Sequence, residues 1–468
     1  MEIFEKKYSK YIEKLYGERR NEEEDKIQIE ENLKIGLSEY KIIERMDMTH
    51  VNTYSIDPDG CEDADDAFSI YKENEKLYLA IHIADPTEYI NINSELWIKI
   101  KEKLITYYPS NRRPIHMIPH DIMERASLMD NNYGNIKKAI TIFTEIDLIN
   151  FLPKGKIKLL FTNIKVEKEK SYSYKRASIE FENISSLKYG LKISEALERE
   201  RGKNALGIKL KEVNNSIIKY ENGIPYLYKD SKYERKMKHM IEEFAIFANT
   251  FVGEYLRFQL DGYGIYRTCD AREIIGDDYE NLNGNDILES IITKGIKADY
   301  MNKVSSHDLV GSNEYTHFTS PIRRASDCIC HYLLKYLKIK SIGNRNINIP
   351  FNNEELLDLS EKCLSKTREI KKIQYTDIKF RLIQVIYNIV NKNGYANIEY
   401  YITGCMNGFV NIIINKIEEH YVYLSYSLRR NNYIEQTGNK KKYNLTIQSV
   451  NCREKFDEGS LPELDNIF

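Results

Sequence analysis

Alternating apolar and polar positions dominate the chain from about residue 53 to residue 180. This period of two is typical of strands. It predicts a short strand over 54–56, then a hairpin that joins 67–71 to 77–83, and two longer strands over 139–149 and 157–166. We therefore expect an antiparallel sheet in the first half of the molecule.

A repeat of three and four positions replaces the alternation further on. It predicts a helix over 233–260, whose apolar face includes Met240, Phe244, Phe247 and Phe251. Ser320 and Pro321 suit the N-cap and first position of a second helix. A longer helix is expected over about 354–390, ending before Gly394.

Beyond residue 394 short apolar runs return around 396–404, 408–414, 420–426 and 443–450. Several short strands in so few residues are typical of a small β-barrel of the OB type. The fold class is thus α+β, in three parts: a helical extension at 1–45, a mixed sheet-and-helix domain at 46–393, and an OB-like barrel at 394–468.

Composition narrows the class of protein. With 42% hydrophobic and 30% charged residues among 468, the chain is not wholly disordered, and no apolar run approaches the 18 or so residues of a membrane span. The first residues are charged and acidic, unlike a signal or transit peptide, so we expect a cytoplasmic protein. With 69 basic and 71 acidic residues, a nucleic-acid partner must be held by a local basic patch.

The densest charge lies between two predicted strands. Six carboxylates fall within ten residues: Asp57, Asp59, Glu62, Asp63, Asp65 and Asp66. Two such charges about 4 Å apart repel by about 1 kcal/mol in water and about 4 kcal/mol near a protein surface. Held in a cleft, the loop favours a divalent cation that prefers oxygen ligands, such as Mg²⁺ or Mn²⁺.

Two other interpretations of this loop compete with a catalytic cation site. An EF-hand counted from Asp57 fails, because Glu62 stands where that motif needs glycine and Phe68 where it needs glutamate. A solvated acidic turn is the simplest alternative, and the loop alone does not exclude it.

Two arginines follow Pro321, where the first turn of a helix normally carries acids. Backbone N–H groups, the helix dipole and Arg323 are expected to converge there on an anion such as a phosphate. Asp327 is close enough in sequence to pair with one arginine, so Arg323 is the better candidate and Arg324 the one more easily neutralised.

These segments, in this order, resemble the catalytic domain of the ribonuclease II/R (RNB) family of exoribonucleases over about residues 45–390. Ile56 and Asp57 with Asp63, Asp65 and Asp66 match that family's four-aspartate motif in spacing. Further similar runs are 80–86 (AIHIADP), 107–109 (YYP), 115–119 (IHMIP), 241–249 (IEEFAIFAN) and 315–324 (YTHFTSPIRR).

The resemblance implies a magnesium-dependent hydrolase, with manganese as an alternative ion, that degrades single-stranded RNA from its 3′ end to nucleoside 5′-monophosphates. It implies no membrane partner and no DNA substrate. In this numbering Asp57, Asp63 and Asp66 would ligate or orient the metal. Asp65 would hold the attacking water or a second metal, and Arg323 would bind the scissile phosphate.

The resemblance also implies residues that contact RNA. Tyr107 would stack on a base near the 3′ end, and Glu242 would contact the terminal nucleotide. His317 either touches RNA or only holds its own turn, and both readings stay open.

The sequence departs from the family pattern at three places, and the departures at Ile208 and Thr367 support a rival function, an RNB-type RNA-binding protein with weak or no turnover. Only about 45 residues precede the domain, where bacterial members carry cold-shock barrels. Ile208 stands where an aromatic residue completes the base clamp, and Thr367 stands where an acid is usual. The four aspartates and Arg323 favour an active enzyme.

Overall fold

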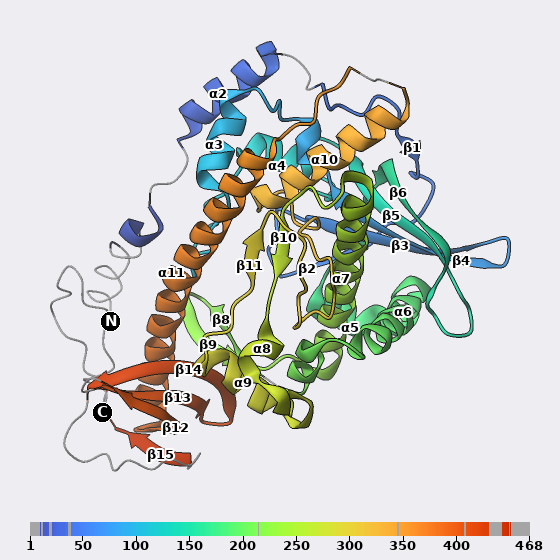
Figure 1. The fold of residues 1–468 in the computed structure, drawn as a ribbon. Coiled ribbons are helices and arrows are strands. Elements are labelled where there is room, and N and C mark those ends of the chain that lie inside the picture. Colours follow the sequence, from blue (N-terminus) through green and yellow to red (C-terminus); the bar gives the residue numbers. More distant parts are fainter. Residues whose placement is uncertain are drawn as a thin grey trace.

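The computed structural model describes residues 10, 13–17, 21–35, 39–213, 215–343, 346–406, 409–429, 442–448 and 450. Its largest sheet has five strands in the order β1-β6-β5-β4-β3, antiparallel except where β1 pairs with β6 (Figure 1). These strands are β1 (Met46–Asp47), β3 (Asp66–Glu73), β4 (Lys76–Ala84), β5 (Ile136–Ile146) and β6 (Pro153–Lys165).

The predicted hairpin and the two longer strands are confirmed, with ends shifted by a few residues. Asn74 and Glu75 alone connect β3 to β4, with φ angles of 49° and 61°. Two consecutive residues with positive φ make a turn whose twist matches that of the strands it joins. The hairpin therefore places Asp66, the last carboxylate of the acidic loop, at the start of β3.

A chain of buried polar side chains crosses this sheet. His82 of β4 lies 3.0 Å from the Ser69 hydroxyl on β3 and 2.9 Å from the Thr141 hydroxyl on β5, and Thr141 continues to Thr162 on β6 at 2.7 Å. Burial lowers the pKa of His82 to about 3, because the charged imidazolium loses its hydration. His82 is thus a neutral member of the core.

Helices cover the sheet. α7 (Lys232–Leu260) follows a capping box of Ser231 and Glu234, which confirms the predicted helix. Phe244 of α7 meets Phe68 of β3 edge-on, with ring centroids 5.5 Å apart. The helix α6 (Ser185–Gly202), not predicted, packs against both α7 and β3 (Figure 1).

The helix after the arginine pair starts later than predicted. α10 spans Ala325–Ser341 with Arg324 as its N-cap, so Ser320 is not the cap and Pro321 is not in the helix. The backbone before α10 pairs instead with the segment after the helix α3 (Glu95–Lys103): Ala325 donates to the Leu104 carbonyl at 2.9 Å, and Thr106 donates to the Arg323 carbonyl at 3.0 Å. This pairing holds Arg324 in an extended conformation that a helix cannot include.

Buried ion pairs fix α10 to the end of β4. Lys335 of α10 reaches Asp85 at 2.9 Å and Glu88 at 3.1 Å, and Arg45 reaches the same two carboxylates at 2.5 and 2.8 Å. Burial alone would raise the pKa of Asp85, but Lys335 and Arg45 hold it well below its usual range. Breaking such a buried pair leaves an uncompensated charge, which typically costs about 3–5 kcal/mol.

Shorter elements complete the larger domain. Its further helices are α2 (Glu22–Ile35), α3 (Glu95–Lys103), α4 (His120–Ala126), α5 (Tyr174–Glu180), α8 (Ala271–Ile275) and α9 (Gly284–Thr293). Three two-stranded ribbons pair β2 (Ser55–Asp57) with β7 (Ser171–Ser173), β8 (Ile217–Glu221) with β9 (Ile224–Tyr228), and β10 (Tyr266–Thr268) with β11 (Asp299–Met301). Among the described residues, none of the helices is both long enough and apolar enough to cross a bilayer.

The long helix α11 (Asn353–Asn393) joins the two parts of the molecule and ends at Gly394, whose φ is 83°. Its last turns, from Leu382 to Val390, share a hydrophobic core with the C-terminal sheet. That antiparallel sheet has the order β14-β13-β12-β15 and comprises β12 (Ala396–Met406), β13 (Phe409–Ile417), β14 (His420–Arg429) and β15 (Lys442–Ile447). The predicted α+β class, with a small C-terminal β domain of OB-like type, is confirmed.

The low pKa of His82 makes the free energy of unfolding depend on pH. In the unfolded chain this histidine has a pKa of about 6.5, whereas in the folded chain it becomes protonated only near pH 3. Between these two values the unfolded chain binds one more proton, so the free energy of unfolding falls as the pH falls from about 6.5 to about 3. Between pH 7 and pH 5 we expect the native protein to lose about 2 kcal/mol more than His82→Gln, measured by urea unfolding. The exposed His50→Gln is the control and should follow the native protein; equal pH slopes for native protein and His82→Gln would contradict this role.

Candidate active site

A pocket of about 570 Å³ lies where the acidic loop meets the segment 315–324. Seven of the eight side chains singled out from the sequence line it: Asp57, Asp63, Asp65, Asp66, Glu242, His317 and Arg323. The structure therefore brings together motifs that are more than 250 residues apart in the chain.

The pocket's carboxylates are placed by the ends of two strands. Asp57 ends β2 and Asp66 starts β3, so the intervening loop is anchored on both sides. Its return path is fixed by Ala64, which donates to the Ser127 hydroxyl at 3.1 Å, and by the Asp65 carbonyl, which accepts from Ala84 at 2.8 Å. Asp59, at the exposed tip, does not line the pocket.

Asp65 is the contact between the two motifs. Its Oδ1 accepts the backbone N–H of Ile322 at 2.8 Å, and its Oδ2 accepts Nε of Arg323 at 3.0 Å. Nη2 of Arg323 also donates to the Ser320 hydroxyl at 2.9 Å. Arg323 is thus oriented by two partners while its side chain remains 43% exposed towards the pocket.

The expected anion site at a helix N-terminus is not formed. Its backbone donors are already bound within the protein: Ser320 donates to Asp327 at 2.8 Å, Ile322 to Asp65, and Ala325 to the Leu104 carbonyl. Arg324 pairs with the fully buried Asp327 at 2.8 Å, so this pair is an internal ion pair and not a surface one. Arg323 remains as the phosphate-binding candidate of this segment.

The carboxylates are crowded at low exposure. Burial, and then the charges of Asp66, Asp65 and Asp63, raise the pKa of Asp57 well above its ordinary value. Burial raises the pKa of Asp65 to about 8 and that of Asp66 to about 6, in both cases against the attraction of Arg323. A positive ion among these groups would relieve the repulsion and allow them to ionise.

The donor set fits a hard divalent cation, because it consists of carboxylate oxygens. The side chains do not yet converge on one point: within the described part of the chain no three His, Cys, Asp or Glu side chains form a ready ligand cluster. Asp65 is turned to Arg323, and Asp63 accepts the hydroxyl of Tyr108 at 2.7 Å. Coordination by either aspartate would require an exchange of these partners.

Tyr107 does not line the pocket. Its ring is 5% exposed and packs in a small core with Tyr16, Ile115, Ile370 and Phe380. The neighbouring Tyr108 lines the pocket instead, because successive side chains of an extended segment point to opposite sides. Both tyrosines belong to the run 107–109, but the sequence prediction gave a role to Tyr107 alone.

Asn249 is a further residue that sequence reasoning did not assign a role. Its amide donates to Tyr315 at 3.0 Å and to Thr319 at 3.3 Å, and its carbonyl oxygen accepts from the Phe318 backbone at 2.8 Å. One side chain of α7 thereby holds the segment 315–319 in place. His317, in that segment, lies 2.7 Å from the Tyr300 hydroxyl through Nδ1, so it both lines the pocket and is fixed in its turn.

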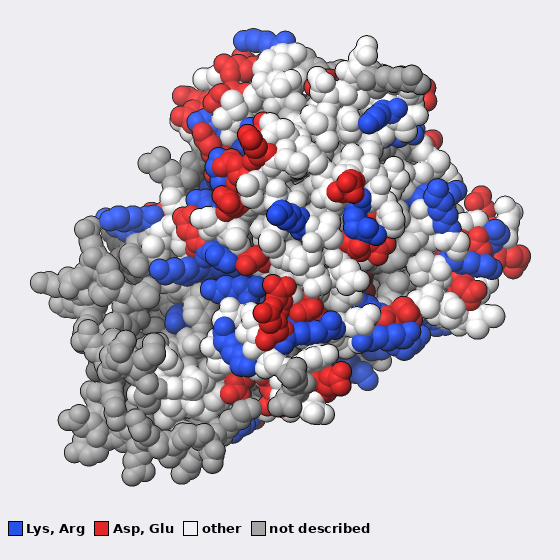
Figure 2. All heavy atoms as spheres, viewed as in Figure 1, with Lys and Arg blue, Asp and Glu red and all other residues white. Residues whose placement is uncertain are grey.

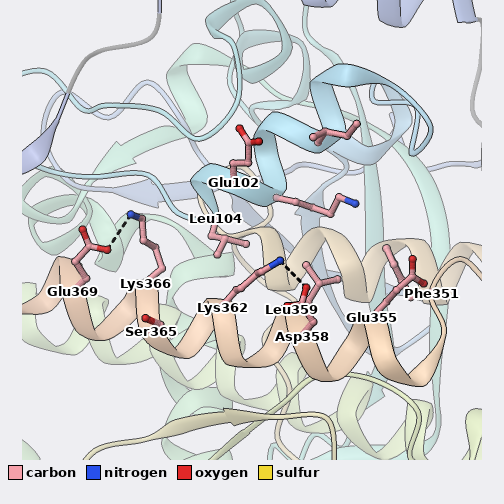
Figure 3. Close-up of a pocket in the computed structure, with 12 residues that line it drawn as sticks. Glu102, Leu104, Phe351, Glu355, Asp358, Leu359, Lys362, Ser365, Lys366 and Glu369 are labelled. Atoms are coloured by element: carbon pink, nitrogen blue, oxygen red, sulfur yellow. Dashed lines mark hydrogen bonds and ion pairs between the residues drawn. The ribbon is translucent and has the colours of Figure 1, made fainter.

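A second pocket, of about 690 Å³, lies between α3 and α11 (Figure 3). Its four carboxylates are already engaged: Asp358 pairs with Lys362, Glu369 with Lys366, Glu102 with Lys99, and Glu355 caps α11. Paired charges of this kind do not call for a cation. The smaller acidic pocket is therefore the candidate active site.

Comparison with known proteins finds ribonucleases named exoribonuclease 2 and ribonuclease R. The chain is 28% identical over 369 residues to exoribonuclease 2 of Buchnera aphidicola, covering 68% of this chain and 54% of that protein. It is 28% identical over 334 residues to ribonuclease R of Ureaplasma parvum, covering 60% and 45%. The chain spans about half the length of the curated relatives it matches.

Solved structures share the fold. Ribonuclease R of Mycoplasma genitalium, in complex with ribose-methylated single-stranded RNA, matches with a TM-score of 0.71 at 17% identity, covering 94% of this chain and 75% of the other. Yeast Ssd1, described as a pseudonuclease, matches with a TM-score of 0.63 at 17% identity, covering 82% and 50%.

The family model of the RNB domain matches residues 45–340, from Arg45 of the buried ion pairs to the last turn of α10. This range is more than half of the chain and contains the whole acidic loop, Asn249 and the arginine pair. The chain belongs to the RNB domain family.

Proposed function

We propose that this protein is a metal-dependent exoribonuclease that hydrolyses single-stranded RNA from the 3′ end and releases nucleoside 5′-monophosphates. The observation that carries the proposal is the contact of Asp65 with Arg323 inside a pocket of four aspartates. Negative groups suited to a cation and a positive group suited to a phosphate meet there at 3.0 Å. This juxtaposition is what phosphodiester hydrolysis needs.

Asp57, Asp63, Asp65 and Asp66 would hold Mg²⁺ or Mn²⁺. A bound divalent cation supplies Lewis-acid stabilisation of phosphate oxygens and lowers the pKa of water. In the proposed reaction Asp65 accepts a hydrogen bond from the attacking water and orients it. Arg323 binds the scissile phosphate and stabilises the charge that develops on its oxygens.

Contacts to the substrate follow from the rest of the pocket. Glu242 and His317 line it and in this proposal contact the terminal nucleotide, and Tyr108 adds an aromatic ring to the same lining. For Tyr107, stacking on a base would require its covered ring to become accessible. The Mycoplasma genitalium relative, solved with single-stranded RNA, supports RNA as the substrate class.

An RNA-binding protein without turnover is the second candidate function. The likeness to the pseudonuclease Ssd1 favours it, as does the burial of Tyr107. The aspartates and Arg323, all present and all lining one pocket, support the active enzyme instead. Turnover by the purified protein decides between the two.

Replacing Asp65 by Asn should abolish hydrolysis, since the neutral amide neither ligates a hard cation well nor orients the water. We expect turnover to fall by at least about 10³-fold, in the range that loss of a positioned catalytic group produces. The measurement is the stepwise shortening of 5′-labelled single-stranded RNA, with Mg²⁺ and with chelator. Asp59→Asn, in the same loop but outside the pocket, is the matched control and should retain full activity.

Equal turnover by Asp65→Asn and the native protein would refute the role of Asp65. Absence of turnover in the native protein, together with intact RNA binding, would establish the second candidate function.

Arg323→Lys should lower kcat by about 10²–10³-fold although the charge is kept. The planar guanidinium donates to Asp65 through Nε and to Ser320 through Nη2 and keeps further N–H groups for a phosphate, whereas the single nitrogen of lysine lacks this fork. Arg125→Lys is the control, because Arg125 is also 43% exposed and also pairs with an aspartate, but outside the pocket. A kcat of the Arg323→Lys variant within twofold of the native value would show that the charge alone matters.

A further inference from the structure

Arg267 is a buried cation that forms no ion pair with any described residue, although the charge of Asp299 acts on it. It lies on β10, is 6% exposed, and its Nη1 has no hydrogen-bond partner among the described residues. Its guanidinium group lies over the ring of Tyr300, 4.4 Å from the centroid. A buried guanidinium that lacks a carboxylate or phosphate is energetically costly, so a ligand is the natural explanation.

Further positive side chains surround Arg267. Burial and the charge of Arg324 lower the pKa of Arg267, and burial, Arg267 and Lys297 lower the pKa of Lys371. Arg368 lies one helical turn before Lys371 on α11 and pairs with Asp299 at 2.8 Å. Asp299 pairs with Arg368 and its charge acts on Arg267, whereas no described carboxylate forms an ion pair with Lys297 or Lys371, so the cluster keeps a net positive charge.

The cluster adjoins the acidic pocket. Arg267 pairs with Tyr300 across the β10–β11 ribbon, and the Tyr300 hydroxyl reaches His317, which lines the pocket. Lys297 and Lys371 are exposed at the rim, the first just before β11 and the second on α11. Figure 2 shows Lys and Arg side chains gathered on the surface where α11 passes β11.

We propose that Arg267, Lys297 and Lys371 form a subsite for a backbone phosphate of the RNA, upstream of the bond that is cut. This inference rests on the proposed function, because it takes RNA as the ligand. The four aspartates repel an anionic strand, so positive charge next to the pocket would add to the attraction that Arg323 supplies within it. The cluster supplies it: the exposed Lys297 and Lys371 meet the phosphate at the surface, and the buried guanidinium of Arg267 adds positive charge behind them.

The test separates binding from turnover. Lys297→Ala and Lys371→Ala change exposed side chains and should leave the fold intact. Arg267→Gln is a third variant, which changes the buried member of the cluster. Binding of 5′-labelled single-stranded RNA is measured by fluorescence anisotropy in chelator, at several salt concentrations. Lys362→Ala is the matched control, because Lys362 is exposed on the same helix but pairs with Asp358.

Each lysine variant is expected to weaken RNA binding about 3- to 10-fold and to reduce the salt slope by about 0.7, the value for one phosphate contact on a single strand. Lys362→Ala should bind like the native protein. Native affinity and salt slope in both lysine variants would overturn the inference and leave the proposed hydrolysis standing. Weakened binding in the lysine variants of a protein without turnover would support the subsite while refuting the proposed function.

Discussion

The position of α10 depends on pairing charges that its burial would otherwise leave unsatisfied. Lys335 is fully buried and is stabilised only because Asp85 and Glu88, just after β4, share it with Arg45. At the other end of the helix the Arg324–Asp327 pair satisfies the same constraint. Because buried ions without partners are so costly, α10 has one acceptable position, and that position places Arg323 against Asp65.

The candidate active site has an excess of acidic side chains, although Arg323 lies among them, and an excess of basic side chains lies beside it. Carboxylates crowd the floor of the pocket, whereas the cluster around Arg267 lies on the α11 side with too few acids to balance it. In each group the charged form is disfavoured: the pKa of Asp57 is raised and the pKa of Arg267 is lowered. These two costs lie side by side, as the proposed binding of a cation and of an RNA phosphate would require.

Local periodicity predicted the hairpin of β3 and β4, the helices α7 and α11 and the C-terminal strands, because each depends on near neighbours in sequence. The predicted start of α10 at Pro321 was wrong, because Arg324 pairs with the chain at Ile105 and this pairing outweighs the cap that Ser320 could provide. Seven of eight candidate site residues line one pocket. Tyr108 and Asn249 escaped prediction because which tyrosine faces inward, and what an amide holds, are decided by contacts distant in sequence.

The helix α11 is a single rod of 41 residues, about 60 Å long, with one end in the core of the large sheet and the other in the core of the C-terminal sheet. The number of residues in α11 therefore sets the rotation of one core relative to the other about the helix axis. Removing one residue near its middle would turn everything beyond it by about 100° and draw it in by about 1.5 Å. The length of this helix, and not only its sequence, is thus constrained: an insertion or deletion keeps both cores packed only if it restores the same helical face.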